Sequence, residues 1–252
     1  MRRAAAFALP ALLLAGCAAA SQAPAQTDAL TIENPYPLEY AKQFTVDVCA
    51  GGYDLITIDG SRYLVVPEGA AAPANLDADI TVLQQPIQNI YLVSSSAMDP
   101  IISIGGLGAV ALSGTQAENW YLDAARTAME QGEIAYAGKY SAPDYETILS
   151  ADCGLAIENT MIYHTPEVKE QLEKFGVPVL VERSSYESDP LARMEWVKLY
   201  GILLGRTEEA ERVFDDAVQR IAPLLDEEPT GKTAAFFSIT SHNLATVRKG
   251  GD

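Results

Sequence analysis

The residues that build metal centres and reactive thiols are scarce in this chain. Its 252 residues include three cysteines, two histidines and two tryptophans, and no CxxC, HExxH or paired Cys/His spacing is present. A structural zinc site is therefore not supported. Cations are few as well, with 17 basic residues against 34 acidic ones and a formal net charge of -17. Such a surface repels nucleic acid and offers anionic lipid no polybasic patch.

Long hydrophobic runs are also missing. The apolar run over residues 4–14 is too short to span a bilayer as a helix. It follows Arg2 and Arg3, and a charged start before a short apolar core is typical of an export signal. We therefore expect residues 1–16 to be a signal peptide.

The end of this run, Leu14-Ala15-Gly16-Cys17, resembles the lipobox of bacterial lipoproteins. That resemblance implies that Cys17 is lipidated and begins the mature protein, held outside the cytoplasmic membrane by its lipid. An ordinary signal peptide cut after Ala20 or Ala25 is the alternative. The stretch after Cys17 is rich in Ala, Gln, Ser and Pro, which predicts a flexible tether over residues 17–42.

With Cys17 assigned to the anchor, only Cys49 and Cys153 remain. An exported protein is able to join them in a disulfide. Each also lies in or beside an apolar, strand-like stretch, where a lone cysteine behaves as a small hydrophobic residue. The sequence leaves both possibilities open.

Short strand-like runs begin the folded part of the chain, at residues 44–48, 54–59 and 63–67. Asp59-Gly60 separates the last two and is a strong hairpin signal. We expect a small antiparallel appendage.

Strand-like and helix-like stretches then alternate. Strands are predicted at 89–93, 109–112, 154–157 and 179–181, and helices at 97–104, 119–131, 143–150 and 166–175. Alternation with short loops predicts a parallel α/β sheet. In such folds, the loops that follow the strands line one edge, where ligands bind.

A long helix is predicted over residues 190–204. Asp189 suits its N-cap, Pro190 its first position and Gly205 its C-terminal stop. A second helix begins at Thr207, and Pro223 should bend or end it. A further strand is expected at 233–238.

The order of these predicted elements resembles that of the iron-complex and cobalamin class of ABC-transporter substrate-binding proteins. In that class, two α/β lobes are joined by one long helix. The segments that carry the likeness are residues 90–94 (IYLVS), 140–146 (YSAPDYE), 152–158 (DCGLAIE) and 189–196 (DPLARMEW). The resemblance implies an α/β fold: a parallel-sheet first lobe with a β appendage over 43–188, a linking helix over 189–205, and the start of a second lobe over 206–252. The family has a full second lobe, so we expect a chain truncated within it.

The function that this resemblance implies is binding and delivery. The protein is expected to be a non-enzymatic, extracytoplasmic lipoprotein that captures an iron-siderophore or cobalamin-like metal complex for an ABC permease and its ATPase, with no cofactor of its own. An exported α/β hydrolase or an adhesion module is the alternative. The sequence has no G-x-S-x-G elbow, which argues against the hydrolase. It also has no repeats, which argues against the adhesion module. Gly106-Leu107-Gly108 precedes a strand instead of following one, so it predicts a turn and not a nucleotide site.

Candidate ligand contacts follow the predicted strands or lie in the segment resembling the family's cleft wall. They are Ser94, Ser95, Ser96, Tyr140, Tyr145, Asn159, Tyr163, His164, Arg183 and Tyr186. Several have a structural alternative. The serines suit a helix cap, His164 a surface position and Tyr145 the core.

Two charged residues have alternatives of the same kind, and a third has one expected role. Arg183 is suited to an anionic siderophore, or to an ion pair with Glu182 or Glu187. Glu167 matches the surface glutamate that, in the family, meets arginines of the permease, although an acid in a first turn also favours the helix dipole. Glu195, on the linking helix, is expected to be structural.

Overall fold

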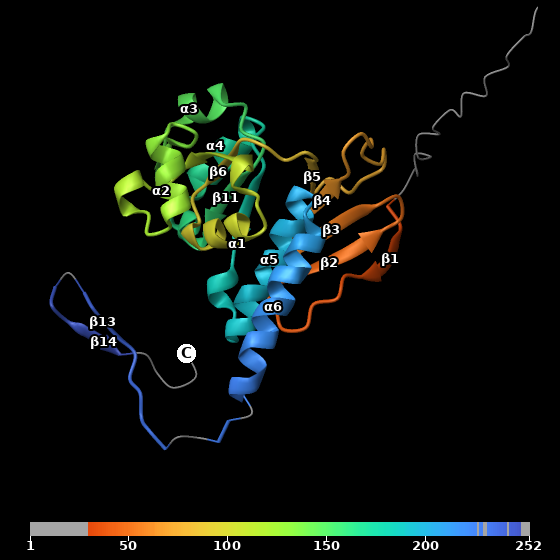
Figure 1. The fold of residues 1–252 in the computed structure, drawn as a ribbon. Coiled ribbons are helices and arrows are strands. Elements are labelled where there is room, and N and C mark those ends of the chain that lie inside the picture. The colour runs from red at the N-terminus through yellow and green to blue at the C-terminus, as the bar shows by residue number, and fades with distance from the viewer. Residues whose placement is uncertain (1–29, 226, 229–230, 241, 248–252) are drawn as a thin grey trace, which may run out of the picture.

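The computed structural model describes residues 30–225, 227–228, 231–240 and 242–247, so Cys17 and the predicted signal lie outside the described residues. Figure 1 shows two sheets with the long helices α5 (Pro190–Leu204) and α6 (Thr207–Leu225) beside them. Within the described ranges, no helix combines the length and apolar character needed to cross a membrane.

The first sheet has the order β1-β2-β3-β4-β5. Its strands are β1 (Ile32–Pro35), β2 (Phe44–Cys49), β3 (Tyr53–Ile58), β4 (Ser61–Val66) and β5 (Ile80–Gln84). The first four are antiparallel, whereas β5 runs parallel to β4. The predicted appendage is thus larger than expected and not purely antiparallel. All four residues of β1 are exposed, so that strand has no hydrophobic alternation by which to recognise it.

The predicted tether over 17–42 is too long at its C-terminal end. Residues 32–35 pair with β2, and the backbone amides of residues 39–42 bind the carboxylates of Glu195, in α5, and of Glu187, just before it. These bonds hold the chain before β2 against α5.

The second sheet is fully parallel, which confirms the predicted α/β class. Its order is β12-β11-β6-β7-β8, with bounds β6 (Ile90–Leu92), β7 (Val110–Ser113), β8 (Ala135–Tyr136), β11 (Ala156–Asn159) and β12 (Val179–Glu182). The connecting helices are α1 (Met98–Ser103), α2 (Asp123–Glu130), α3 (Tyr145–Ser150) and α4 (Pro166–Lys174). The short strands β9 (Gly138–Lys139) and β10 (Ala142–Pro143) pair between β8 and α3.

Each face of the parallel sheet packs into a different core. Because successive side chains of a strand point to opposite faces, Ile157 joins the core shared with α5 and the first sheet, while Ala156 joins the core on the other face. Phe44 of β2 meets Trp196 of α5 edge-on, with ring centroids 4.9 Å apart. The first sheet is therefore part of the main core.

Helix α5 has the predicted bounds, because its signals are local. The Asp189 carboxylate accepts a hydrogen bond from the Leu191 amide at 2.8 Å, and Gly205 ends the helix with φ 64°. Helix α6 then packs closely on α5: a Cβ added at Gly201 would lie 2.5 Å from the Cβ of Ala210.

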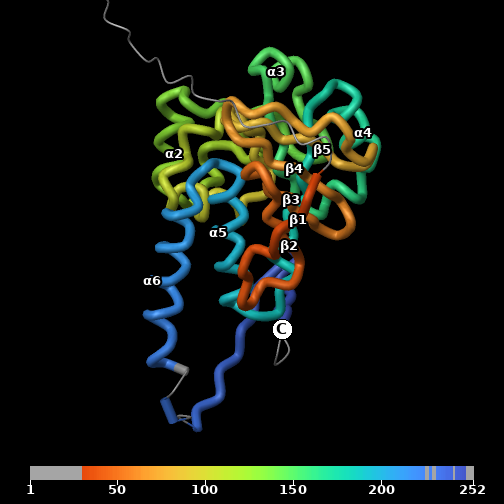
Figure 2. The backbone as a smooth tube through the Cα atoms, turned by 90° about the vertical axis from the view of Figure 1, so that its right-hand side faces the viewer, coloured from red at the N-terminus to blue at the C-terminus, as the bar shows by residue number. Residues whose placement is uncertain are grey.

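Helix α6 continues past Pro223 to Leu225. Figures 1 and 2 both show its C-terminal half extending away from the two sheets. The expected strand at 233–238 begins later, as β13 (Phe237–Ile239), and pairs in antiparallel fashion with β14 (Ala245–Val247). The residues of both strands are exposed.

Candidate functional site

The carboxyl-terminal edge of the parallel sheet gathers several predicted site residues. Strand β11 pairs in parallel with both β6 and β12. The segments that follow these strands, residues 93–97, 160–165 and 183–189, therefore lie along one edge. This is the place that the sequence predicted for the ligand.

Two serines and a buried carboxylate form a cluster at this edge. The hydroxyls of Ser94 and Ser96 lie 2.9 and 2.8 Å from Oε2 of Glu182 and 2.9 Å from each other. The amide of Ser184 donates to the other oxygen of Glu182 at 2.8 Å. Ser94 makes no side-chain cap bond to the following 3-10 helix, whereas Ser95 is exposed in that helix. The hydroxyls of Ser94 and Ser96 thus bind the carboxylate of Glu182, and that of Ser94 does not cap the helix.

Arg183 has partners that the sequence did not indicate. Its guanidinium lies 2.7 Å from the carboxylate of Asp59 and 3.3 Å from the side-chain oxygen of Gln43. It also stacks over the ring of Tyr186, 4.6 Å from the centroid. The expected partners Glu182 and Glu187 are engaged elsewhere, so Arg183 joins the β12 loop to the β3–β4 turn.

The segment after β11 presents exposed side chains. The side-chain oxygen of Asn159 accepts from the Met161 amide at 2.9 Å and so begins the 3-10 helix Thr160–His164. Tyr163 is 48% exposed and His164 is exposed as well. Their position leaves both accessible to a ligand.

Tyr140 and Tyr145 are half-buried at the second core. The ring of Tyr145 packs edge-on against Phe175, at a centroid distance of 5.7 Å, and burial raises the pKa of its hydroxyl. Glu167 is exposed in the first turn of α4, where its charge favours the helix dipole.

A buried acid next to this site was not predicted. Glu158 of β11 is 0% exposed, and neither of its carboxylate oxygens has a hydrogen-bond partner among the described residues. Burial raises the pKa of Glu158 to about 8. A charged residue after an apolar run usually marks the end of a strand, so the burial of Glu158 could not be predicted from its neighbours in the sequence.

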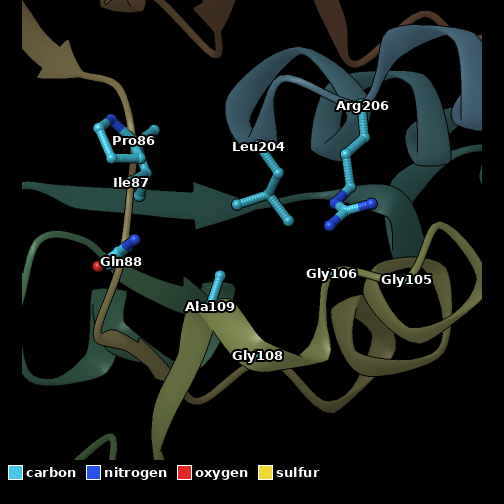
Figure 3. A pocket seen from close by; sticks show the side chains of 9 residues that line it. All are labelled: Pro86, Ile87, Gln88, Gly105, Gly106, Gly108, Ala109, Leu204 and Arg206. Carbon is cyan, nitrogen blue, oxygen red and sulfur yellow. The ribbon is translucent and has the colours of Figure 1, made fainter. Parts of the chain in front are cut away.

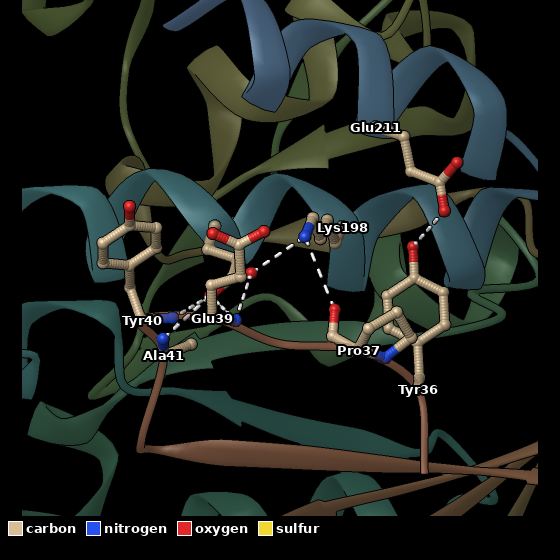
Figure 4. Close-up of polar contacts among 8 residues, drawn as sticks. Tyr36, Pro37, Glu39, Tyr40, Ala41, Lys198 and Glu211 are labelled. Atoms are coloured by element: carbon tan, nitrogen blue, oxygen red, sulfur yellow. Dashed lines mark hydrogen bonds and ion pairs between the residues drawn. The ribbon is translucent and has the colours of Figure 1, made fainter. Parts of the chain in front are cut away.

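Two further buried carboxylates bind five consecutive backbone amides. Glu195 accepts from the amides of Glu39, Tyr40 and Ala41 at 2.8–2.9 Å, and from the ammonium of Lys198 at 2.8 Å (Figure 4). Burial opposes the charge of Glu195, but these bonds outweigh it and lower its pKa. The structural role predicted for Glu195 agrees with this arrangement.

Glu187 continues the same contact. It accepts from the amides of Lys42 and Gln43 at 3.0 and 2.9 Å, and from the indole of Trp196 at 3.1 Å. We call Glu187, Glu195 and the amides of residues 39–43 the carboxylate clasp.

A separate pocket lies at the opposite edge of the sheet, before β6 and β7. It has a volume of about 240 Å³ and includes Gly105, Gly106, Leu204 and Arg206 in its lining (Figure 3). Residues Leu107–Ala109 form a 3-10 turn that leads into β7, and a Cβ on Gly106 would lie 2.7 Å from Cδ1 of Leu204. This confirms the turn predicted at Gly106-Leu107-Gly108.

The part of the chain that the structure describes holds no group of three or more Cys, His, Asp or Glu residues that would suit a metal ion. Cys49 and Cys153 are both buried and free, so the disulfide alternative is wrong for this structure.

The chain is similar in sequence to one curated protein and in fold to several solved structures. No protein-family model matches the chain. An uncharacterized lipoprotein, MJ0878 of Methanocaldococcus jannaschii, is 21% identical over 174 residues, covering 64% of this chain and 41% of the relative.

Two crystal structures resemble the fold. The periplasmic heme-binding protein HutB of Vibrio cholerae matches with a TM-score of 0.51 and 16% identity, over 64% of this chain and 58% of that one. Over the matched part, the chain shares the α/β fold of this protein. Holo-ViuP matches with a TM-score of 0.51 and 15% identity, over 80% of this chain and 58% of its own. The chain thus spans less than two thirds of the length of each of these proteins.

Proposed function

We propose that this chain is an extracytoplasmic, lipid-anchored solute-binding protein that captures an iron-siderophore or cobalamin-like metal complex for an ABC importer. The observation that carries the proposal is the shared edge of β6, β11 and β12 in a fold of the periplasmic binding type. Residues 94–96, Asn159, Tyr163, His164, Arg183 and Tyr186 are the proposed contacts, and Tyr140 and Tyr145 remain candidates. Glu167 is proposed to meet the permease.

The edge favours binding over hydrolysis. A serine hydrolase needs a histidine that takes the proton of the nucleophile. In the described structure, the hydroxyls of Ser94 and Ser96 bond to Glu182, and no hydrogen bond joins either to His164 or His242. The proposal is therefore a binding site without a catalytic role.

Ligand binding is the direct test. We expect one member of a panel of ferric hydroxamates, ferric catecholates, haemin and cyanocobalamin to change the intrinsic fluorescence of the chain saturably. Replacing Tyr186 with alanine should weaken that binding about tenfold, because an exposed aromatic contact is lost. Arg206→Ala, at the opposite pocket, is the matched control and should leave it unchanged. Binding that depends on Arg206 and not on Tyr186 would refute the site, and no binding by any member would refute the function.

The anchor has its own test. Cys17→Ser should leave the protein exported but move it from the membrane fraction to the soluble fraction, because the lipid on Cys17 is the proposed attachment. Fractionation followed by immunoblotting measures this. A variant that stays in the membrane fraction would remove the lipoprotein assignment.

A further inference from the structure

Two arginines lie at the segment after β12: Arg183 within it, which is paired with an acid, and Arg193 of α5, whose Nε donates to the carbonyl of Glu187 at 3.0 Å. Of the segments after β6, β11 and β12, only the last carries a lysine or arginine, namely Arg183. Its side chain is 16% exposed, and Asp59 lies 2.7 Å from its guanidinium. Asp59 itself has φ 49°, a left-handed backbone conformation that Asp and Asn tolerate better than most residues. Arg183 is therefore held by the fold and is not free for an anion.

The same edge carries a buried carboxylate, Glu182, at the end of β12, and no ion pair is found for it among the described residues. Glu182 is 2% exposed and is held by hydroxyls and one amide. Each serine hydroxyl has one hydrogen, and the three contacts among Ser94, Ser96 and Glu182 use both. Ser96 therefore presents oxygen lone pairs to a ligand, and no hydroxyl hydrogen.

The other loops of this sheet add no cluster of positive charge. Lys139 follows β8, at the end of the sheet opposite β12. The carbonyl of its neighbour Gly138 accepts a hydrogen bond from the hydroxyl of Tyr91, which belongs to the second core. Glu118 follows β7 and is acidic. A polyanionic ligand would thus meet hydroxyl oxygens that lie against a buried carboxylate.

We infer that the edge selects an uncharged or cationic chelate that donates hydrogen bonds, and discriminates against polyanionic chelates. This rests on the proposed function and narrows its ligand class. Aromatic surface on the ligand suits the edge too, since Tyr186 is 55% exposed with Arg183 stacked on it. Amide-bearing corrinoids and uncharged ferric trihydroxamates meet these conditions, whereas ferric tricatecholates do not.

Freeing Arg183 tests the inference. Equilibrium binding of cyanocobalamin, an uncharged ferric trihydroxamate and a ferric tricatecholate is measured for the full chain and two variants. For the parent chain, we expect an uncharged chelate to bind at least about tenfold more tightly than the tricatecholate. Asp59→Asn keeps the turn and releases the guanidinium, so it should raise tricatecholate affinity about tenfold, and added salt should reduce the gain.

Asp79→Asn is the matched control. Asp79 lies just before β5 and binds Arg62 of β4. This variant therefore makes the same change in net charge away from the edge and should leave tricatecholate affinity unchanged. Tighter binding of the tricatecholate than of both uncharged chelates by the parent chain would overturn the inference and leave the proposed function standing. Equal gains in the two variants would also overturn it. Failure of every chelate to bind would overturn both proposals.

Discussion

Replacing Glu195 with alanine is expected to lower the free energy of unfolding by about 3–5 kcal/mol, because one partner of a buried ion pair is removed. The variant leaves the Lys198 ammonium, which is 8% exposed, without its counter-charge. It also leaves the amides of residues 39–41 without their acceptor. Such a loss is a large share of the stability of an ordinary domain.

Urea unfolding measures this loss, with Glu170→Ala as the control. Glu170 is exposed on α4 and lies 3.9 Å from Lys174, so its replacement should change stability by less than about 0.5 kcal/mol. Amide hydrogen exchange adds a local readout, since residues 39–41 should exchange much faster in the Glu195 variant. A loss below about 1 kcal/mol, with those amides still protected, would show that the clasp contributes little.

Replacing Glu158 with glutamine is expected to stabilise the protein at neutral pH. The pKa of Glu158 is about 8 in the folded chain, against 4.5 for an ordinary glutamate. Because the folded value is raised, the parent chain loses stability as pH rises from 4.5 to 8, and at pH 7 this loss is about 3 kcal/mol. Glutamine is uncharged at every pH and avoids the loss.

The dependence on pH separates this effect from a change in packing. The stability difference between Glu158→Gln and the parent chain should be constant below pH 4.5, grow up to pH 8 and level off above it. Urea unfolding at a series of pH values measures it, with the exposed Glu146→Gln of α3 as the control. A difference that does not change with pH would contradict the buried, neutral carboxyl.

The parts of the fold that depend on local signals were predictable from the sequence. The bounds of α5 follow from Asp189, Pro190 and Gly205, and alternating strands and helices gave the parallel sheet. The carboxyl-terminal edge follows from the order of a parallel sheet, so the segments after β6, β11 and β12 are predictable without their side-chain contacts.

The parts that depend on distant contacts were not predictable. The amides of the clasp bind carboxylates more than 140 residues later in the chain, and their own segment looks like a linker. Arg183 and Asp59 are 124 residues apart, so nearer acids were the natural candidates. The burial of Glu158 and Glu182 depends on what covers the ends of their strands, which hydrophobic periodicity does not show.

Hydrogen exchange with and without a saturating chelate tests most directly that the ligand lies at the carboxyl-terminal edge. We expect slower exchange in residues 93–98, 159–165 and 183–186, and no change in residues 86–88 and 105–109 of the opposite pocket. Protection confined to the opposite pocket, with the three edge segments unchanged, would contradict this location of the ligand.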